Sequence, residues 1–220
     1  MSEAFPQSRM EPVYGFFHYI IAVAYGIAFR GEVAGQQHLP ADGAFLVAGN
    51  HVSFLDPPLI GVHVPRQLAF FARKTLWKPG IAAWWLDAVG TIPVDRDGGQ
   101  DVSALKRVLR TLKENKGLIL FPEGTRSPDG TIQEPKSGVG FIVCKSQVPV
   151  VPARIFGTFE AFGRGMKFPR LGVPVTVVFG PPLHPADYDA PKAGKDRYQI
   201  VSERIMAAVS KLERPKITVV

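Results

Sequence analysis

After residue 30 the chain alternates between short apolar runs and longer amphipathic stretches. Short apolar runs bounded by glycine, proline or polar residues are typical of buried strands. Such runs predict strands at residues 44–48, 68–72, 118–121, 148–155 and 173–179. A shorter segment, residues 90–96, predicts a strand that ends in Arg96.

The stretches between these runs have the period of an amphipathic helix. Residues 101–115 place their apolar side chains on one helical face, with Asp101 as a candidate N-cap and Gly117 beyond the end. Further elements are predicted as helices at 137–145 and 198–212 and as a loop at 181–195. Because strands alternate with helices and no long linker intervenes, we predict an α/β fold: a mixed, mostly parallel sheet flanked by helices.

The N-terminal stretch 13–29 contains no Asp, Glu, Lys or Arg. As a helix it would be roughly 25 Å long, the lower limit for crossing a bilayer. It is rich in tyrosine and phenylalanine, and tyrosine favours the headgroup region of a membrane. We predict a helix, or a broken helical pair, lying in or dipping into one leaflet; a buried core helix is the alternative. The chain then divides into a membrane-interface segment, residues 1–30, and an α/β domain, residues 31–220.

Composition narrows the possible functions. The 220 residues are 46% hydrophobic and 20% charged, which excludes intrinsic disorder. A single cysteine, Cys144, excludes an internal disulfide framework and a multi-cysteine zinc site. The net charge of +7 favours anionic partners: nucleic acid, phosphorylated substrates or an acidic membrane. The basic segment 164–170 can contact lipid headgroups or substrate phosphates, or can simply be solvated.

A histidine and an aspartate follow the first predicted strand, in the sequence NHVSFLD. His51 and Asp56 would point about 140° apart on one continuous helix, so they meet only if His51 lies in the turn before the helix. In that case Asp56 can accept from one ring nitrogen and leave the other as a free base. A loop histidine bonded to the backbone is the alternative.

Two arginines follow predicted strands. Arg96 ends the short segment described above, and Arg126 belongs to the sequence FPEGTRS at residues 121–127. A guanidinium group matches phosphate oxygens with two parallel hydrogen bonds, although each arginine can also be a solvated surface residue. Gly124 permits close approach of a ligand to the backbone, and Glu123 can orient Arg126 or bind an acceptor hydroxyl.

Four blocks resemble, in this order, the signature of the PlsC-type glycerolipid acyltransferases (the lysophosphatidic acid acyltransferases): NHVSFLD at 50–56, GTIPVDR at 90–96, FPEGTRS at 121–127 and VPVVP at 148–152. The resemblance covers residues 50–155, about half the chain. A further block, residues 72–76, resembles the family element A-K-x-E-L, with Arg73 and Thr75 at the usual Lys and Glu positions. Pro93 stands where the family often has an aromatic or aliphatic residue. These departures concern the identity of the acceptor.

The resemblance implies a glycerolipid acyltransferase fold with a membrane-associated N-terminal helical element, a peripheral or monotopic protein on the cytoplasmic face of the cell membrane. The implied reaction transfers a fatty acyl group from acyl-CoA or acyl carrier protein to the free hydroxyl of lysophosphatidic acid, giving phosphatidic acid. His51 would be the general base, and Asp56 would hold its tautomer. The implied substrate-binding residues are Arg73, Arg96, Glu123, Gly124, Thr125 and Arg126.

We expect no cofactor, metal or enzyme nucleophile, because the thioester supplies the driving force. Cys144 is interpreted as a core residue, and segment 148–153 as a buried or edge strand, with the lining of an alkyl slot as the alternative. The expected partners are a lysophospholipid, an acyl thioester and an anionic membrane surface, and no nucleic acid. Other readings are an acyltransferase for glycerol 3-phosphate, another lysophospholipid or a glycolipid, a basic nucleic-acid-binding module, and a thioester hydrolase.

Overall fold

The computed structural model describes residues 11–94 and 102–215. Its helices are α1 (Pro12–Ala28), α2 (Asp56–Gly61), α3 (Ile81–Ala88), α4 (Val102–Lys113), α5 (Ser137–Ser146), α6 (Thr158–Phe162), α7 (Pro185–Tyr188) and α8 (Arg197–Ser210), with 3-10 turns η1 (Gln36–His38), η2 (Lys74–Leu76) and η3 (Pro191–Asp196). Its strands are β1 (Glu32–Ala34), β2 (Phe45–Gly49), β3 (Leu68–Arg73), β4 (Thr91–Val94), β5 (Gly117–Leu120), β6 (Val150–Phe156) and β7 (Thr176–Phe179).

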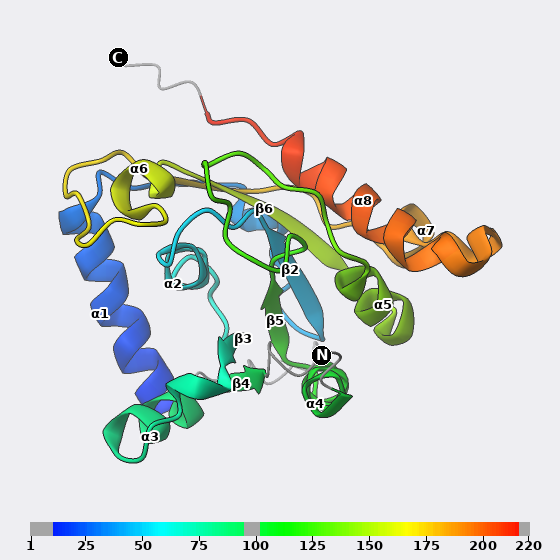
Figure 1. Cartoon of the computed structure of the whole chain (residues 1–220), viewed down its shortest axis with the longest axis horizontal. Coiled ribbons are helices and arrows are strands. Elements are labelled where there is room, and N and C mark those ends of the chain that lie inside the picture. Colours follow the sequence, from blue (N-terminus) through cyan, green and yellow to red (C-terminus); the bar gives the residue numbers. More distant parts are fainter. Residues whose placement is uncertain (1–10, 95–101, 216–220) are drawn as a thin grey trace, which may run out of the picture.

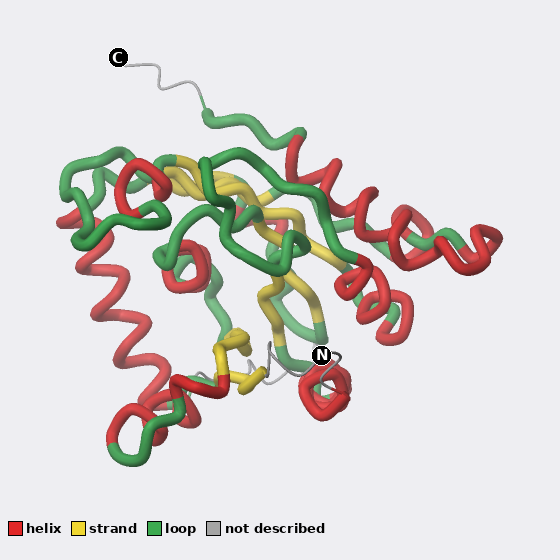
Figure 2. Tube along the Cα trace, in the orientation of Figure 1, coloured by secondary structure: helices red, strands yellow, loops and turns green. Residues whose placement is uncertain are grey.

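Within the described residues the strands form one sheet in the order β1-β7-β6-β2-β5-β3-β4. All neighbouring pairs are parallel except β6 and β7, which are antiparallel. Helices cover both faces: α4, α5 and α8 lie on one side, and α1, α2 and α6 on the other (Figure 1). Figure 2 shows the strands running between these two helical layers. The predicted mixed, mostly parallel sheet flanked by helices is confirmed.

Both faces of the central strands are buried. In β2, Leu46 and Ala48 pack beneath α4, α5 and α8, whereas Phe45 and Val47 pack toward α1 and α2. Successive side chains of a strand point to opposite faces, so a strand covered on both sides needs apolar residues at every position. This requirement explains the uninterrupted apolar runs in the sequence.

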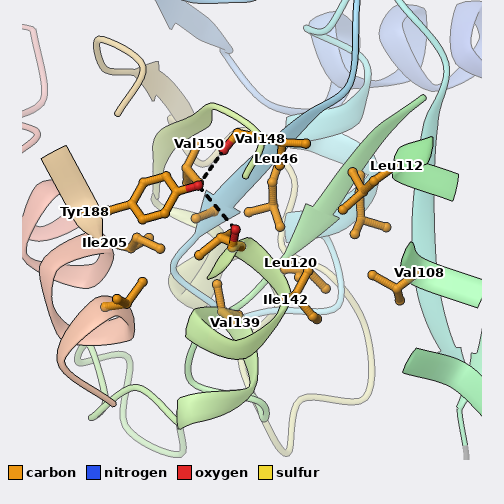
Figure 3. Packing of buried hydrophobic residues seen from close by; sticks show 14 of the residues in the cluster. Leu46, Val108, Leu112, Leu120, Val139, Ile142, Val148, Val150, Tyr188 and Ile205 are labelled. Atoms are coloured by element: carbon orange, nitrogen blue, oxygen red, sulfur yellow. Dashed lines mark hydrogen bonds between the residues drawn. The ribbon is translucent and has the colours of Figure 1, made fainter. Parts of the chain in front are cut away.

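Tyr188 closes the layer formed by α5 and α8 (Figure 3). It is fully buried, and its hydroxyl lies 3.0 Å from the carbonyl oxygen of Val148 and 3.3 Å from that of Val143. The hydroxyl of a buried tyrosine needs a hydrogen-bond partner, and these two carbonyl oxygens supply it. Cys144 is buried in the same cluster, as predicted. Strand β6 lies between β2 and β7, so segment 148–153 contributes a buried internal strand and no edge.

The prediction of a loop over residues 181–195 was wrong in part, because α7 lies within it and η3 begins within it. Pro185 begins α7, and the Asp187 carboxylate accepts a hydrogen bond from the backbone N–H of His184 at 2.8 Å. Proline and aspartate are frequent in loops, but they are also favoured at the first turn of a helix. Composition alone therefore could not separate the two structures.

Helix α1 is one continuous helix of 17 residues, not a broken pair. Tyr14 and Tyr25 are buried against the domain, and the Tyr25 hydroxyl donates to the Val175 carbonyl at 2.9 Å. Phe16 and Tyr19, on the opposite side of the helix, are exposed. Across residues 11–94 and 102–215, no helix combines the length and apolar character needed to cross a membrane.

Candidate active site

The carboxyl ends of β2, β5 and β6 lie side by side. Strand β2 pairs in parallel with β5 on one side and with β6 on the other. Residues 50–56, 121–127 and 157–158 follow these strands, and Asp56 and Thr158 begin α2 and α6. Ligand sites of α/β proteins gather where parallel strands end. Strand order therefore brings two of the predicted motifs together, along with a third segment that the sequence did not indicate.

His51 and Asp56 form a hydrogen-bonded pair, with Nδ1 2.9 Å from Oδ2. His51 lies in the turn after β2, and Asp56 is the first residue of α2, so the geometric condition derived from the sequence is met. A carboxylate only accepts, so Nδ1 carries the ring proton and Nε2 keeps its lone pair. Within the described part of the chain, no group hydrogen-bonds to Nε2. The imidazole thus has the geometry of a general base.

The Asp56 side chain is fully buried and surrounded by hydrogen-bond donors. Besides the imidazole, Oδ2 accepts from the backbone N–H groups of Val52 at 2.6 Å and Ser53 at 2.7 Å. Oδ1 accepts from the Thr158 hydroxyl at 2.6 Å. Hydrogen bonds to a charged acceptor are strong and offset the cost of burying the charge. They hold the carboxylate, and through it the imidazole, in one orientation.

The FPEGTRS segment holds His51 from three directions. The imidazole stacks on the Phe121 ring, with 4.2 Å between centroids and 21° between planes. The backbone N–H of His51 donates to Glu123 Oε1 at 2.7 Å, and its carbonyl accepts from the Ser127 N–H at 2.8 Å. The His51 side chain remains 12% exposed. Its ring is therefore fixed in place but still accessible.

Glu123 is only 1% exposed, and its carboxylate faces backbone groups. Oε1 accepts from His51, and Oε2 accepts from the Gln133 N–H at 3.1 Å. This placement corrects the expectation that Glu123 orients Arg126 or binds an acceptor hydroxyl, because a buried carboxylate with both oxygens bonded to backbone does not reach a substrate. Burial raises the pKa of Glu123 to about 7; the charge of Asp56 adds to the rise, and the two backbone N–H groups oppose it.

Arg126 rests on an aromatic ring from the other motif. Its guanidinium carbon lies 3.4 Å from the centre of the Phe54 ring, a cation–π arrangement. Phe54 follows Ser53 in the turn between β2 and α2 and is 63% exposed. Gly124 has a φ of +70°, which glycine adopts without strain, and Gly124 and Thr125 are both exposed. The exposed part of FPEGTRS therefore adjoins the turn that carries His51.

Two predicted phosphate-binding side chains lie outside the described part of the chain, namely Arg96 and the side chain of Arg73. Strands β3 and β4 are parallel neighbours, with Arg73 of β3 opposite Val94, the last residue of β4. The role of the two arginines in substrate binding stays a prediction.

An apolar cavity of about 290 Å³ lies between α1, α2, α3, strand β3 and the edge strand β4. Its lining includes Tyr14 and Phe17 of α1, Trp85 of α3 and Phe71 of β3. Phe54 also lines it, so the cavity reaches the turn between His51 and α2.

Sequence reasoning missed Thr158, the stacking role of Phe121 and the platform formed by Phe54. Thr158 lies 102 residues from Asp56, and no local pattern links the two. Asn50 was part of the motif, but its function was not apparent: its side-chain amide bonds both the carbonyl and the N–H of Ile155, at 3.1 and 2.8 Å. It thereby fixes the end of β2 to β6.

Comparisons with known proteins agree with this geometry. The chain is 29% identical over 190 residues to the 1-acyl-sn-glycerol-3-phosphate acyltransferase of Bacillus subtilis, covering 85% of this chain and 91% of that protein. It is 29% identical over 158 residues to a chloroplastic 1-acyl-sn-glycerol-3-phosphate acyltransferase of Brassica napus, covering 69% of this chain and 46% of that protein. The chain spans about half the length of several curated relatives that it matches.

The crystal structure of the 1-acyl-sn-glycerophosphate (LPA) acyltransferase PlsC from Thermotoga maritima is also similar, with a TM-score of 0.73 and 27% sequence identity. The match covers 94% of this chain and 81% of that one. The family model described as Acyltransferase matches residues 30–156, which contain the His51–Asp56 pair and the FPEGTRS segment. On this match, and with the paired histidine and aspartate at the junction of β2 and α2, the chain belongs to the Acyltransferase family.

Proposed function

We propose that this chain is a 1-acylglycerol-3-phosphate O-acyltransferase, which transfers a fatty acyl group from an acyl thioester to the free hydroxyl of lysophosphatidic acid. The observation that carries the proposal is the His51–Asp56 pair, whose Nε2 has no partner within the described residues. The names of the similar proteins from Bacillus subtilis and Thermotoga maritima support the choice of acceptor. Acyl-CoA and acyl carrier protein are both retained as donors.

The reaction requires a base because an alcohol is barely ionised at neutral pH. His51 Nε2 takes the proton of the acceptor hydroxyl as its oxygen attacks the thioester carbonyl carbon. The imidazolium that forms lies 2.9 Å from the Asp56 carboxylate, which stabilises its charge. Collapse of the tetrahedral intermediate forms the ester and releases the thiol, which receives the proton. The thioester supplies the driving force, so the proposal includes no cofactor and no metal.

The acceptor phosphate is placed against Arg126, with Arg96 and Arg73 as further predicted contacts. The stack on Phe54 holds the Arg126 guanidinium close to the turn that carries His51. Gly124 and Thr125, which precede it in the chain, are exposed. A planar guanidinium group binds phosphate oxygens with two parallel hydrogen bonds, so these groups would set the distance between the phosphate and the reacting hydroxyl.

We place an acyl chain in the apolar cavity between α1, α2 and α3, because Phe54 connects this cavity to the catalytic turn. The exposed side of α1, with Phe16 and Tyr19, is proposed to lie at a membrane surface. The substrate would then enter from the bilayer in which it is dissolved. This gives the protein a peripheral or monotopic position, which we assign to the cytoplasmic face of the cell membrane.

The test is an acyl-transfer assay with purified protein, labelled acyl-CoA or acyl carrier protein, and lysophosphatidic acid, with the lipid product identified by mass spectrometry. We expect phosphatidic acid from the intact chain and at least about 10²-fold less from His51→Ala. A panel of glycerol 3-phosphate, other lysophospholipids, a glycolipid and unphosphorylated monoacylglycerol tests the acceptor. Preference for another acceptor would replace the proposed substrate, and release of free fatty acid alone would indicate a thioester hydrolase.

A further inference from the structure

The loop between α6 and β7, residues 163–172, has no role in the mechanism above, yet it exposes large apolar side chains. Phe168 is 80% exposed and Leu171 is 70% exposed. Exposing both on one short loop is unfavourable in water, and clustered exposed apolar residues mark interaction sites.

The same loop is strongly basic. Arg164, Lys167 and Arg170 are all exposed, and residues 161–174 contain no Asp or Glu. In the described part of the chain, none of these three cations forms an ion pair with a carboxylate. The loop therefore presents three positive charges next to two apolar side chains.

The loop is continuous with the exposed side of α1. The Gly172 N–H donates to the carbonyl of Ala28, the last residue of α1, at 2.7 Å. Figure 1 shows the loop at the C-terminal end of that helix. Ile27, one residue earlier, is 83% exposed. The exposed large apolar residues of α1 share one side of the helix and lead toward this end: Phe16, Tyr19, Ile20, Val23 and Ile27.

This combination matches a membrane surface. Apolar side chains enter the boundary between headgroups and acyl chains, and Lys and Arg are attracted to anionic lipids. Nucleic acid would be contacted by the cations but would leave the apolar stripe of α1 unused. The positive charges of the loop, with no acidic residue at 161–174 to offset them, complement the negative charge of phosphatidylglycerol or phosphatidylserine headgroups.

The base of the loop contacts the catalytic turn directly. The Ser53 hydroxyl donates to the Phe162 carbonyl at 2.7 Å, and Ser53 forms an isolated β-bridge with Gly163. The Phe54 and Phe162 rings lie 6.2 Å apart. The base of the loop therefore packs directly on the turn that holds His51.

We propose that residues 163–172 form an anionic-lipid-binding loop that inserts Phe168 and Leu171 at the membrane surface and places Arg164, Lys167 and Arg170 among the headgroups. The occupant is a lipid bilayer. The inference builds on the proposed function only in that the acceptor is a membrane lipid. The binding measurement itself requires neither substrate nor turnover.

The test is co-sedimentation of the full chain with vesicles of phosphatidylcholine alone or with 30% phosphatidylglycerol. We expect stronger binding to the anionic vesicles, and weaker binding at higher salt. The charge variant combines Arg164→Gln, Lys167→Gln and Arg170→Gln. Each charge near such a surface changes partitioning about fivefold, so the three changes together should weaken binding about 100-fold. The apolar variant, Phe168→Ser with Leu171→Ser, should weaken binding to both kinds of vesicle.

The matched control combines Lys106→Gln, Arg107→Gln and Arg110→Gln on α4, which packs on the opposite face of the sheet from α1. The control variant loses the same total charge as the charge variant. Its loss of vesicle binding should be less than about a tenth of the loss in the charge variant, because charges far from the membrane surface are screened. Equal losses in the control and the charge variant would overturn the inference, since net charge alone would then explain binding. Wild-type binding by both loop variants would also overturn it and would assign this surface to a different occupant.

Insertion is measured independently with an environment-sensitive fluorophore on Phe168→Cys, in a Cys144→Ala background. A blue shift on anionic vesicles supports insertion, and unchanged emission contradicts it. Acyl transfer to a soluble short-chain lysophosphatidic acid, and the KM for acyl-CoA, should be unchanged in the charge and apolar variants. A lower rate of acyl transfer or a higher KM for acyl-CoA would assign the loop to substrate binding instead. If the intact chain binds vesicles through the loop but makes no phosphatidic acid, the proposed function fails and the loop assignment stands.

Discussion

The buried carboxyl group of Glu123 makes the folded state sensitive to pH. Burial raises its pKa from 4.5 to about 7, so the folded chain binds this proton more tightly than the unfolded chain. The stabilisation from the bound proton is complete below pH 4.5, is lost as the pH rises toward 7, and stays lost above it. At 1.36 kcal/mol per pKa unit, the rise corresponds to at most about 3 kcal/mol of folding free energy.

The perturbation that isolates this effect is Glu123→Gln, which keeps the shape but cannot ionise. We expect the stability of the variant relative to the wild type to increase by up to about 3 kcal/mol between pH 4.5 and pH 8, because only the wild type then buries a charge. The assay is urea unfolding followed by tryptophan fluorescence at a series of pH values. Titrating groups that do not interact with Glu123 cancel in the comparison, including His63, whose pKa is lowered to about 4 by burial and by the charge of His18.

Glu134→Gln provides the control, since Glu134 is exposed and lies in the same segment. Its stability difference from the wild type should be nearly independent of pH. If the curves for the wild type and Glu123→Gln run parallel from pH 4.5 to 8, the carboxyl group is not held in the buried, proton-retaining environment that the structure describes, and the reasoning fails.

Three further predictions concern the catalytic turn. His51→Ala should lower kcat by about 10²- to 10⁴-fold, the usual contribution of a general base, while the circular dichroism spectrum stays unchanged. A folded variant with near-normal turnover would show that His51 is not the base. Thr158→Val should destabilise the fold by about 1–3 kcal/mol in thermal unfolding, because Asp56 Oδ1 loses the hydroxyl that donates to it at 2.6 Å. Thr158→Ser keeps a hydroxyl and should retain most of the stability, so equal losses in the two variants would contradict the role of this hydrogen bond. Arg126→Ala should raise the KM for lysophosphatidic acid much more than the KM for the acyl donor, and unchanged acceptor kinetics would exclude Arg126 from the phosphate site. Phe54→Leu should have the same effect to a smaller extent, whereas Phe54→Tyr should keep the acceptor KM near that of the wild type.

The elements predicted most accurately were those whose burial requires a regular pattern. The amphipathic stretch 101–115 became α4, and the apolar runs became strands with ends shifted by a few residues. Helix α3 and the short strand β1 were not predicted. The sequence IAAWWLDA of α3 is apolar around most of the helix, so it shows little of the period that marks an amphipathic helix.

At the site, local spacing was enough to state how His51 and Asp56 could meet, because both lie within one turn of chain. The role of Glu123 could not be predicted, since its partners are backbone N–H groups at His51, 72 residues away, and at Gln133. Thr158 is more remote still, and it reaches Asp56 only because β6 pairs with β2.

Side-chain chemistry and short-range periodicity, both written in the chain itself, specified the α/β class, the histidine–aspartate pair and the basic character of the protein. Strand order depends on contacts between distant segments. It decided which loops are neighbours, that the Glu123 carboxylate is buried against the backbone of His51, and which apolar side chains remain exposed beside α1. The reason is physical: a local pattern records whether a residue prefers burial, whereas its partners are set by the packing of the whole sheet.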